Sequence, residues 1–375
     1  MTRKSETVAA EVAVVGAGIC GLFTAYKLAR LGFDVVIIEA ASRVGSGSSS
    51  RNEGWLHSGT YHASSVTDRA TALRVARNCA AGHEQIRRLF PESLEPMSNG
   101  SVALVRDPAR AEESESRWSE SAVQFSTLTP RDTRARLPEV ELSEVHRSYL
   151  VADAGINTRI LHRVLLTEAT LRGARLFLRH TLNYAADGAP VLLNVDGGRR
   201  ALSADFTVLA TGFQSGNLLS SLDSISALRM WKSHVLYGPQ LTSCPVFWLD
   251  PGEATLINHS GDVSVIGLNE DARRIPDVDV NVDEVRAEAV RNALIRLIPD
   301  VDPKNYTAAA CVKVDWGRNE DIRSVEMQIR EVAEGTFMAL PGKLTEAPVL
   351  ADRLARILAV RTEINQTSSR PWDRI

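Results

Sequence analysis

The sequence has few cysteines, and they form no redox or metal motif. Only four occur in 375 residues, Cys20, Cys79, Cys244 and Cys311, and they lie far apart with no CxxC pair. This absence argues against a disulfide reductase, and we predict no metal centre. Because stable disulfides belong to oxidising compartments, we expect these to be reduced, buried thiols of a cytoplasmic protein.

An excess of one charge and long apolar runs are missing as well. The formal net charge is -3 and the basic residues are scattered, which argues against nucleic-acid and membrane-surface partners. The apolar segment 12–29 contains three glycines and Lys27, so it is too short and interrupted to cross a membrane or act as a signal peptide. A small anionic substrate stays possible, because its pocket needs only a few basic side chains.

The first organised segment is a strand–helix–strand unit. Residues 1–10 show no strand or helix pattern and are expected to form a loose leader. Residues 12–15 form an apolar run that ends at a glycine cluster, which is typical of a buried parallel strand. Apolar residues at helical spacing follow over 22–29, and residues 35–38 predict a second strand.

The remaining pattern predicts two interleaved domains, a number that the chain length also allows. Amphipathic helices are expected over 69–90, 158–173 and from about 347 to 360. A small antiparallel meander is predicted between residues 174 and 203, where turn signals separate short apolar runs. A buried strand is expected over 206–210.

The glycine cluster fits a dinucleotide fingerprint. Residues 16–21 read G-x-G-x-x-G between a predicted strand and a predicted helix. Gly16 permits the tight turn, Gly18 lets the backbone approach a pyrophosphate, and Gly21 allows the helix to lie close to the strand. Glu39 ends the second strand, where a carboxylate accepts ribose hydroxyls and disfavours NADP. A glycine-rich turn of an unrelated α/β fold is the alternative.

The fingerprint alone does not choose between FAD and NAD. NAD domains normally continue into another helix after the acidic residue, whereas residues 41–54 are small and flexible here. A stretch of this kind can place amide and hydroxyl donors around a second phosphate and a longer cofactor.

The next segment carries a family resemblance. Residues 50–61 resemble the flavin-contacting loop of the D-amino-acid oxidase superfamily, above all the branch that holds L-2-hydroxyglutarate dehydrogenase and the FAD-dependent glycerol-3-phosphate dehydrogenases. Three further segments match in order, at residues 153–158, 208–212 and 341–345. The resemblance implies FAD and an electron-transfer role. One departure is Asn157-Thr158, where many relatives have Asp-Pro, and it concerns only a helix start.

The resemblance also implies an α/β fold, in which a discontinuous, Rossmann-like (GR2-type) FAD domain carries an inserted mixed or antiparallel substrate domain. We assign residues 11–90, 143–215 and 322–375 to the FAD domain. Residues 91–142 and 216–321 are assigned to the substrate domain.

The expected FAD contacts come from the glycine turn, the end of the second strand, the small-residue loop and the two later motifs. They are Gly16, Gly18, Ile19, Cys20, Gly21, Glu39, Ala40, Ser48, Ser49, Ser50, Asn52, Gly54, Leu56, His57, Ala210, Thr211, Gly212, Gly342, Lys343, Leu344 and Thr345. A helix starting near Gly342 would point its positive end at the flavin, and Lys343 would add a charge. A surface lysine beside a capping glycine is the alternative.

Four residues are candidates for handling the substrate. His57 could be a general base, a covalent tether to the flavin, or a structural residue, and the sequence leaves these roles open. Arg318 aligns by resemblance with an arginine that binds anionic substrates, although a surface ion pair is equally compatible. Lys232 and His234 could face the flavin from the substrate domain, where a lysine could help oxygen accept electrons.

The predicted function is oxidation of a C–OH or C–N bond in a small anionic substrate, a 2-hydroxy acid or an amino acid. Oxygen, a quinone or an electron-transfer protein would then take the electrons. The alternatives are a flavin-dependent monooxygenase and a non-catalytic protein that uses the FAD fold for binding.

Overall fold

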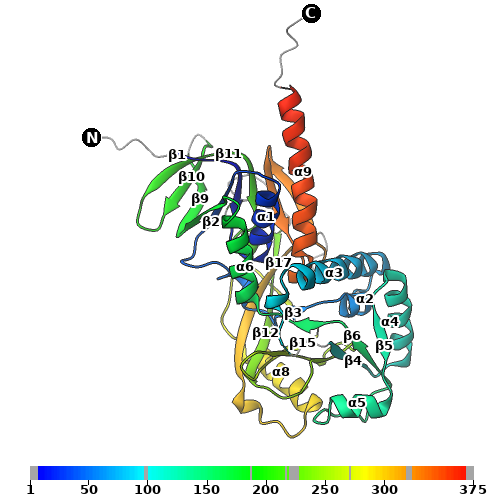
Figure 1. The fold of residues 1–375 in the computed structure, drawn as a ribbon. Helices are drawn as coiled ribbons and strands as arrows, with labels where there is room; N and C mark the ends of the chain where they lie inside the picture. Colours follow the sequence, from blue (N-terminus) through cyan, green and yellow to red (C-terminus); the bar gives the residue numbers. More distant parts are fainter. Residues whose placement is uncertain are drawn as a thin grey trace, which may run out of the picture.

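The computed structural model describes residues 7–96, 100–185, 188–215, 218, 228–269, 272–317 and 323–368. These residues form two large sheets, each with helices packed on it (Figure 1). A two-stranded ribbon of β3 (Trp55–Leu56) and β7 (Ala154–Gly155) adds a third, small sheet.

The first sheet has a parallel centre in the order β8-β2-β1-β11-β19. Strand β18 pairs antiparallel with β19 at one edge, and β9 and β10 extend β11 as an antiparallel meander. The strands are β1 (Thr7–Val15), β2 (Val35–Glu39), β8 (Arg175–Leu178), β9 (His180–Tyr184), β10 (Pro190–Asn194), β11 (Arg199–Leu209), β18 (Gln328–Ala333) and β19 (Thr336–Leu340). This strand order is that of a dinucleotide-binding domain.

Both faces of the first sheet are covered, as a parallel sheet requires. On one face lie α1 (Ile19–Arg30), α6 (Thr158–Thr170) and α9 (Ala347–Ser368), whose apolar sides share a core with Val12 and Val14 of β1. The meander strands β9 and β10 contribute to the core on the other face, against residues such as Ala13 and Val36.

The second sheet is almost entirely antiparallel, with the order β16-β12-β15-β14-β13-β4-β6-β5 and with β17 paired to β12. Its strands are β4 (Ser101–Val105), β5 (Phe125–Thr127), β6 (Arg147–Val151), β12 (Leu228–Pro239), β13 (Val246–Trp248), β14 (Ala254–His259), β15 (Val263–Leu268), β16 (Arg273–Ile275) and β17 (Thr307–Trp316).

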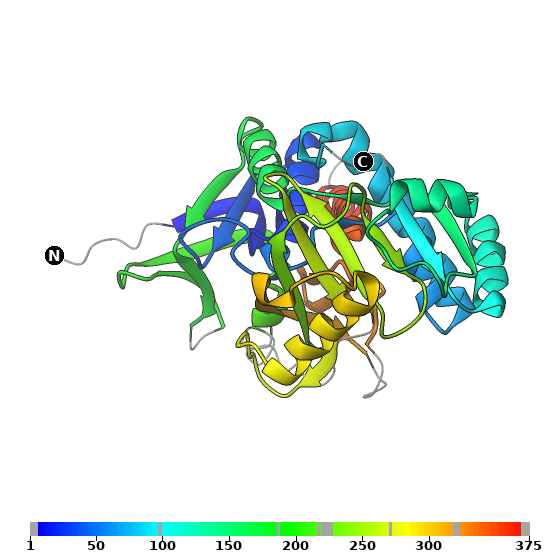
Figure 2. The same ribbon diagram turned by 90° about the horizontal axis from the view of Figure 1, so that it is seen from below.

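Helices also pack on the second sheet. Helix α8 (Glu284–Leu297) shares a core with β4, β13, β14 and β15, and Figure 2 shows it lying against the strands. A second core lies around α2 (Thr60–Ser65) and α4 (Pro108–Ser121). The other helical elements are α3 (Arg69–Leu89), α5 (Pro130–Arg136), η1 (Ser48–Ser50), η2 (Pro91–Ser93), η3 (Gly212–Gln214), η4 (Pro303–Asn305) and η5 (Leu344–Glu346). No helix in the described part of the chain combines the length and apolar character that crossing a bilayer requires.

The structure confirms the helices predicted over 69–90, 158–173 and 347–360 and corrects two expectations. The first strand begins at Thr7, because residues 7–10 pair with residues 201–204 of β11, so the loose leader was predicted too long. Strand β6 lies within the range assigned to the FAD domain, yet it pairs with β4 in the second sheet.

Candidate active site

The turn between β1 and α1 has no room for a side chain at Gly16 or Gly21. Gly16 has a φ of +100°, and a Cβ there would lie 2.6 Å from the carbonyl oxygen of Ala210. A Cβ at Gly21 would lie 1.8 Å from the carbonyl oxygen of Gly16. Gly18 is the N-cap of α1 and supplies no side-chain acceptor, and Ile19 N–H donates to Ser49 Oγ at 3.0 Å. This backbone fits a pyrophosphate bound at a helix N-terminus.

The acidic residue at the end of β2 lies beside this turn. Glu39 accepts the N–H of Ala17 and the N–H of Ala41, each at 2.8 Å. Its carboxylate is therefore held at the carboxyl edge of the parallel strands, where a dinucleotide presents its ribose hydroxyls. The predicted strand end and the fingerprint thus come together in space.

The small-residue loop is held by its own hydrogen bonds and by the second sheet. Asn52 Nδ2 donates to the carbonyl oxygens of Ser48 and Ser49 at 3.1 Å, and Gly54 N–H donates to Asn52 Oδ1 at 2.8 Å. Ser48 Oγ donates to the carbonyl oxygen of Val312 in β17. The loop therefore joins the glycine turn to a strand of the other sheet.

The two later motifs meet the same region. Ala210 follows β11 and donates its N–H to Val15 O of β1 at 2.8 Å, which brings Thr211 and Gly212 to the strand edge. Thr345 of η5 accepts the backbone N–H of His57 at 3.0 Å. All four motifs of the family resemblance therefore lie around one site. The motif at 153–158 contributes through Asp153, which lies 3.7 Å from His57.

His57 is buried within a group of aromatic rings. Its exposed fraction is 9%, and its ring centroid lies 4.2 Å from that of Trp55 and 4.4 Å from that of His62. Burial lowers the pKa of His57, although the nearby carboxylate of Asp153 acts in the opposite direction. The imidazole is therefore largely neutral at neutral pH and has a lone pair with which to accept a proton.

Three basic residues lie around the same site, and two of them were not predicted from the sequence. Lys313 is on β17, Arg323 follows it in the chain, and Lys343 precedes η5. Burial lowers the pKa of Lys343 well below its usual range, and the charges of Arg323 and Lys313 lower it further. Burial also opposes ionisation of the Glu53 carboxyl, but Lys313 and other positive charges hold its pKa below the usual value. The site therefore combines basic groups with the carboxylates of Glu53 and Asp153.

Arg323 is fixed by its neighbours at this position. Ser324 N–H donates to Asp315 of β17, and Arg323 Nη2 donates to the carbonyl oxygen of Gly342 at 3.4 Å. Its Nε is buried and has no hydrogen-bond partner among the described residues. Arg318, the predicted anion-binding residue, lies outside the described residues. The sequence did hold one clue to Arg323, since this residue lies in the same connection between β17 and β18 as Arg318.

Lys232 and His234 do not join this cluster. Lys232 Nζ contacts Asp279 Oδ2 at 2.6 Å, and His234 Nε2 accepts the N–H of Asp283, the N-cap of α8, at 3.1 Å. The sequence suggested that both could face the flavin, whereas the structure places them toward the segment that leads into α8.

The strand pairing explains this difference. Residues that lie opposite each other in antiparallel strands share a face, and neighbouring residues point to opposite faces. Trp231 lies opposite Lys313, and Ser233 lies opposite Cys311. Lys313 therefore lies on the same face as Trp231 and Ser233. Lys232 and His234, each one residue farther along β12, lie on the opposite face.

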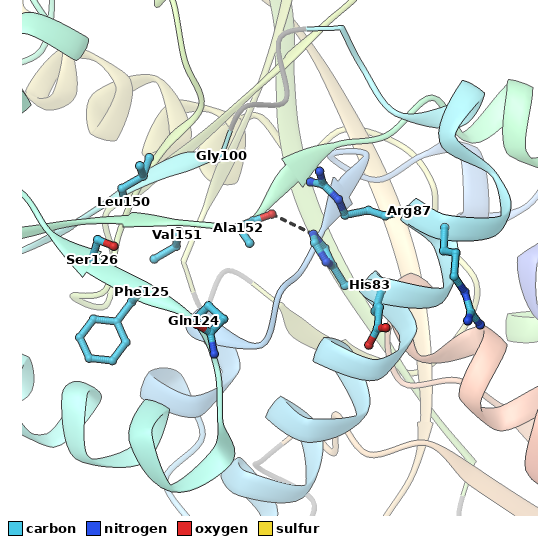
Figure 3. Close-up of a pocket in the computed structure, with 11 residues that line it drawn as sticks. His83, Arg87, Gly100, Gln124, Phe125, Ser126, Leu150, Val151 and Ala152 are labelled. Atoms are coloured by element: carbon cyan, nitrogen blue, oxygen red, sulfur yellow. Dashed lines mark hydrogen bonds between the residues drawn. The ribbon is translucent and has the colours of Figure 1, made fainter.

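A cavity of about 830 Å³ lies elsewhere, at the end of β6, and contains none of the predicted site residues (Figure 3). It is lined by residues of α3, of β5 and β6 and of the segments next to them: His83, Glu84, Arg87, Arg88, Gly100, Gln124, Phe125, Ser126, Leu150, Val151 and Ala152.

The cysteines are free, and three of the four are buried, whereas Cys244 is half-buried. Within the described ranges, no group of three or more His, Cys, Asp or Glu side chains could hold a metal ion.

Comparison with known proteins identifies the family. The model of the DAO family, described as FAD dependent oxidoreductase, matches residues 11–356. The chain belongs to this family. It is an FAD-dependent oxidoreductase, and FAD is its cofactor. The residues fit this cofactor, because the glycine turn leaves the start of α1 open to a pyrophosphate, the carboxylate at the end of β2 lies beside that turn, and the donor-rich loop joins the turn to β17.

Two curated proteins of the family share short, well-matched segments with this chain. Gamma-glutamylputrescine oxidoreductase of Escherichia coli is 41% identical over 73 residues, which are 20% of this chain and 17% of that protein. Mitochondrial L-2-hydroxyglutarate dehydrogenase of Arabidopsis thaliana is 43% identical over 61 residues, which are 16% of this chain and 13% of that protein. The chain therefore matches less than a fifth of either relative.

Solved structures of the DAO family share the whole fold. L-proline dehydrogenase from P. horikoshii has a TM-score of 0.75 at 18% identity, covering 95% of this chain and 94% of its own. Glycine oxidase from Geobacillus kaustophilus has a TM-score of 0.72 at 18% identity, covering 94% and 95%. L-alpha-glycerophosphate oxidase from Mycoplasma pneumoniae, with FAD bound, has a TM-score of 0.72 at 13% identity, covering 94% and 95%.

The glycine turn yields a first prediction. A Cβ at Gly18 meets only Ser49 Oγ, at 3.1 Å, so Gly18→Ala should fold but narrow the approach to the pyrophosphate. We expect its Kd for FAD to rise by about tenfold or more, equivalent to about 1.4 kcal/mol, in a titration followed by flavin fluorescence. Gly21→Ala should instead lower the unfolding temperature sharply. A Gly18→Ala variant that binds FAD as tightly as the wild type would contradict this role.

A buried acid near the site yields a second prediction. Glu346 is fully buried, and its Oε1 accepts from Asn78 Nδ2 at 3.1 Å, whereas its Oε2 has no hydrogen-bond partner within the residues that the structure describes. Burial raises the pKa of Glu346 from 4.5 to about 8. Between pH 4.5 and about 8, the carboxyl of Glu346 therefore keeps its proton in the folded protein and loses it in the unfolded chain. The resulting stabilisation is complete below pH 4.5 and is lost as the pH rises through about 8.

Glu346→Gln should remove this pH dependence. Relative to the wild type, the variant should gain about 1.4 kcal/mol in the free energy of unfolding for each pH unit between 5 and 8. Thermal unfolding of the FAD-bound protein at several pH values measures the difference. Glu284→Gln, at a site whose side chain is 74% exposed, serves as the control. A stability difference that does not change with pH would show that Glu346 is ionised in the folded protein.

Proposed function

We propose that this protein oxidises the C–OH or C–N bond of a small anionic substrate, a 2-hydroxy acid or an amino acid. The observation that carries the proposal is the grouping of His57 with Lys313, Arg323 and Lys343 beside the flavin loop. The similar proteins include enzymes named for 2-hydroxyglutarate, proline and glycine, and these names favour the same substrate class.

Each group has a proposed role in this reaction. Arg323 and Lys313 bind the anionic group of the substrate, since a guanidinium can hold a carboxylate with two hydrogen bonds. Arg318 stays a further proposed anchor from the same connection. His57 accepts the hydroxyl or amine proton through its neutral imidazole. FAD, when bound, would supply the hydride acceptor for the substrate carbon, so that the product would be a keto or imino compound.

Three wider assignments stay part of this proposal. The free cysteines support a cytoplasmic location. The electron acceptor is oxygen, a quinone or an electron-transfer protein, and the site favours none of these. The domain division proposed from the sequence is kept, with β6 moved to the substrate domain because of its pairing with β4.

The proposal is tested by anaerobic reduction of the flavin. The yellow protein is mixed under anaerobic conditions with L-2-hydroxyglutarate, glycine, L-proline, γ-glutamylputrescine and glycerol 3-phosphate, and the flavin absorbance is followed. We expect at least one carboxylate-bearing compound to bleach the flavin. Bleaching by none of them, while dithionite reduces the flavin fully, would contradict the substrate class.

The proposed anion site gives a separate prediction. Arg323→Ala should raise the apparent Kd of the reducing substrate about 10- to 100-fold, because a charge-assisted bidentate contact is lost, while the FAD content stays at wild-type level. Arg318→Ala is measured in parallel. Arg172→Ala, which removes an exposed ion pair with Glu168 on α6, is the control. An unchanged Kd in Arg323→Ala would remove Arg323 from the substrate site.

A further inference from the structure

Asp153 is a buried carboxylate that organises the segment carrying His57. Its exposed fraction is 0%, and it lies in the link between β6 and β7. Its Oδ1 accepts from Trp55 Nε1 at 2.9 Å, and its Oδ2 accepts the hydroxyls of Ser58 and Thr60. All three donors come from the same six-residue segment as His57. Because a buried charge is tolerated only when it is hydrogen-bonded, these contacts fix the segment around the carboxylate.

The backbone of Asp153 is fixed from the opposite side. Ser101 Oγ of β4 donates to the carbonyl oxygen of Asp153 at 2.8 Å. His83 Nε2 of α3 lies 2.8 Å from the carbonyl oxygen of Ala152, as the dashed line in Figure 3 shows. The carboxylate therefore has a position set by elements outside the flavin loop, and this position can in turn set the orientation of the loop.

The imidazole of His57 presents Nδ1 to this carboxylate. His57 Nδ1 lies 3.7 Å from Asp153 Oδ1, and in the described part of the chain the buried Nδ1 has no hydrogen-bond partner. This distance is within ion-pair range and longer than a hydrogen bond, and contacts of catalytic groups commonly shorten when substrate binds. The rings of Trp55 and His62 pack against the imidazole, and the bond from the backbone N–H of His57 to Thr345 holds the main chain, so that other placements of the ring are restricted.

We infer that Asp153 is a positioning residue, which keeps the proton of neutral His57 on Nδ1 so that Nε2 can accept the hydroxyl or amine proton of the substrate. When Nε2 takes that proton, the imidazole becomes an imidazolium, and the carboxylate offsets the new charge. The inference rests on the proposed function, because it assumes that His57 is the base.

The charges around His57 determine in which direction its pKa should change when Asp153 is substituted. Asp153 and, before β3, Glu53 favour the imidazolium, whereas Lys343 before η5 disfavours it. His62 of α2 is a further titratable neighbour, and burial lowers its pKa well below the usual value. Asp153→Asn removes one of the two negative charges, so the pKa of His57 should fall further.

The first test is spectroscopic and needs no substrate. The eight histidines of the FAD-bound protein are labelled with ¹⁵N, and the His57 signals are identified by their loss in His57→Gln. In the wild type we expect the Nδ1–H tautomer. In Asp153→Asn we expect a loss of this preference and a fall of about one unit in the pKa of His57. An unchanged tautomer and pKa would overturn the inference.

The second test is kinetic and uses the compound that bleaches the flavin fastest in the anaerobic panel. Asp153→Asn should lower the rate of flavin reduction about tenfold or more with little change in the apparent Kd, and the acid limb of the pH profile should move to lower pH. In a His57→Gln background the same substitution should have almost no effect. An equal loss in both backgrounds would show a merely structural role.

Two further variants complete the design. Ser101→Ala removes a contact to the backbone of Asp153 but leaves its carboxylate intact, so it should lower stability without changing the tautomer or the pKa of His57. Thr60→Val removes one donor from the carboxylate and should raise the pKa of His57, which keeps the inference testable if Asp153→Asn fails to fold. Failure of the whole substrate panel would contradict the proposed function, while the spectroscopic result would still decide the role of Asp153.

Discussion

The absence of side chains at Gly16 and Gly21 is the constraint on which the site depends. It lets α1 begin directly against the ends of β1 and β11, since a Cβ at either glycine would overlap a backbone carbonyl. The first turn of α1 is thereby brought to the same strand edge as Glu39 and Ala210. A helix N-terminus in this position stabilises a pyrophosphate by its amides and its dipole. A larger residue would move the helix away and separate these groups.

We propose that the first sheet holds the cofactor. Of the groups proposed to act on the substrate, only Lys313 lies on the second sheet, whereas His57 follows β3 and the other two belong to connecting segments. The loop that begins with Ser48 is tied to β17 through Val312, so the cofactor path and the strand that carries Lys313 are held together. His57 lies farther along the same chain segment and is tied to η5 through Thr345. Because these connections are hydrogen bonds between well-packed elements, the base and the cations have a fixed relation to the cofactor path.

Local patterns were enough to predict the glycine turn, the acidic strand end and the long helices, because each depends on residues close in sequence. The substrate side was harder to predict. Lys232 and His234 lie on the correct strand but on its other face, and a strand does not reveal from its own sequence which face is inward. Arg323 and the carboxylate of Asp153 reach the site through long-range packing, which no local spacing records.

The central claim is that one FAD binds each chain with its pyrophosphate at the start of α1. Calorimetric titration of FAD into protein freed of its cofactor, repeated in the presence of excess NAD, tests this claim most directly. The account predicts one FAD bound per chain, with an affinity that NAD does not change. Saturation by NAD, with no heat of FAD binding, would contradict it.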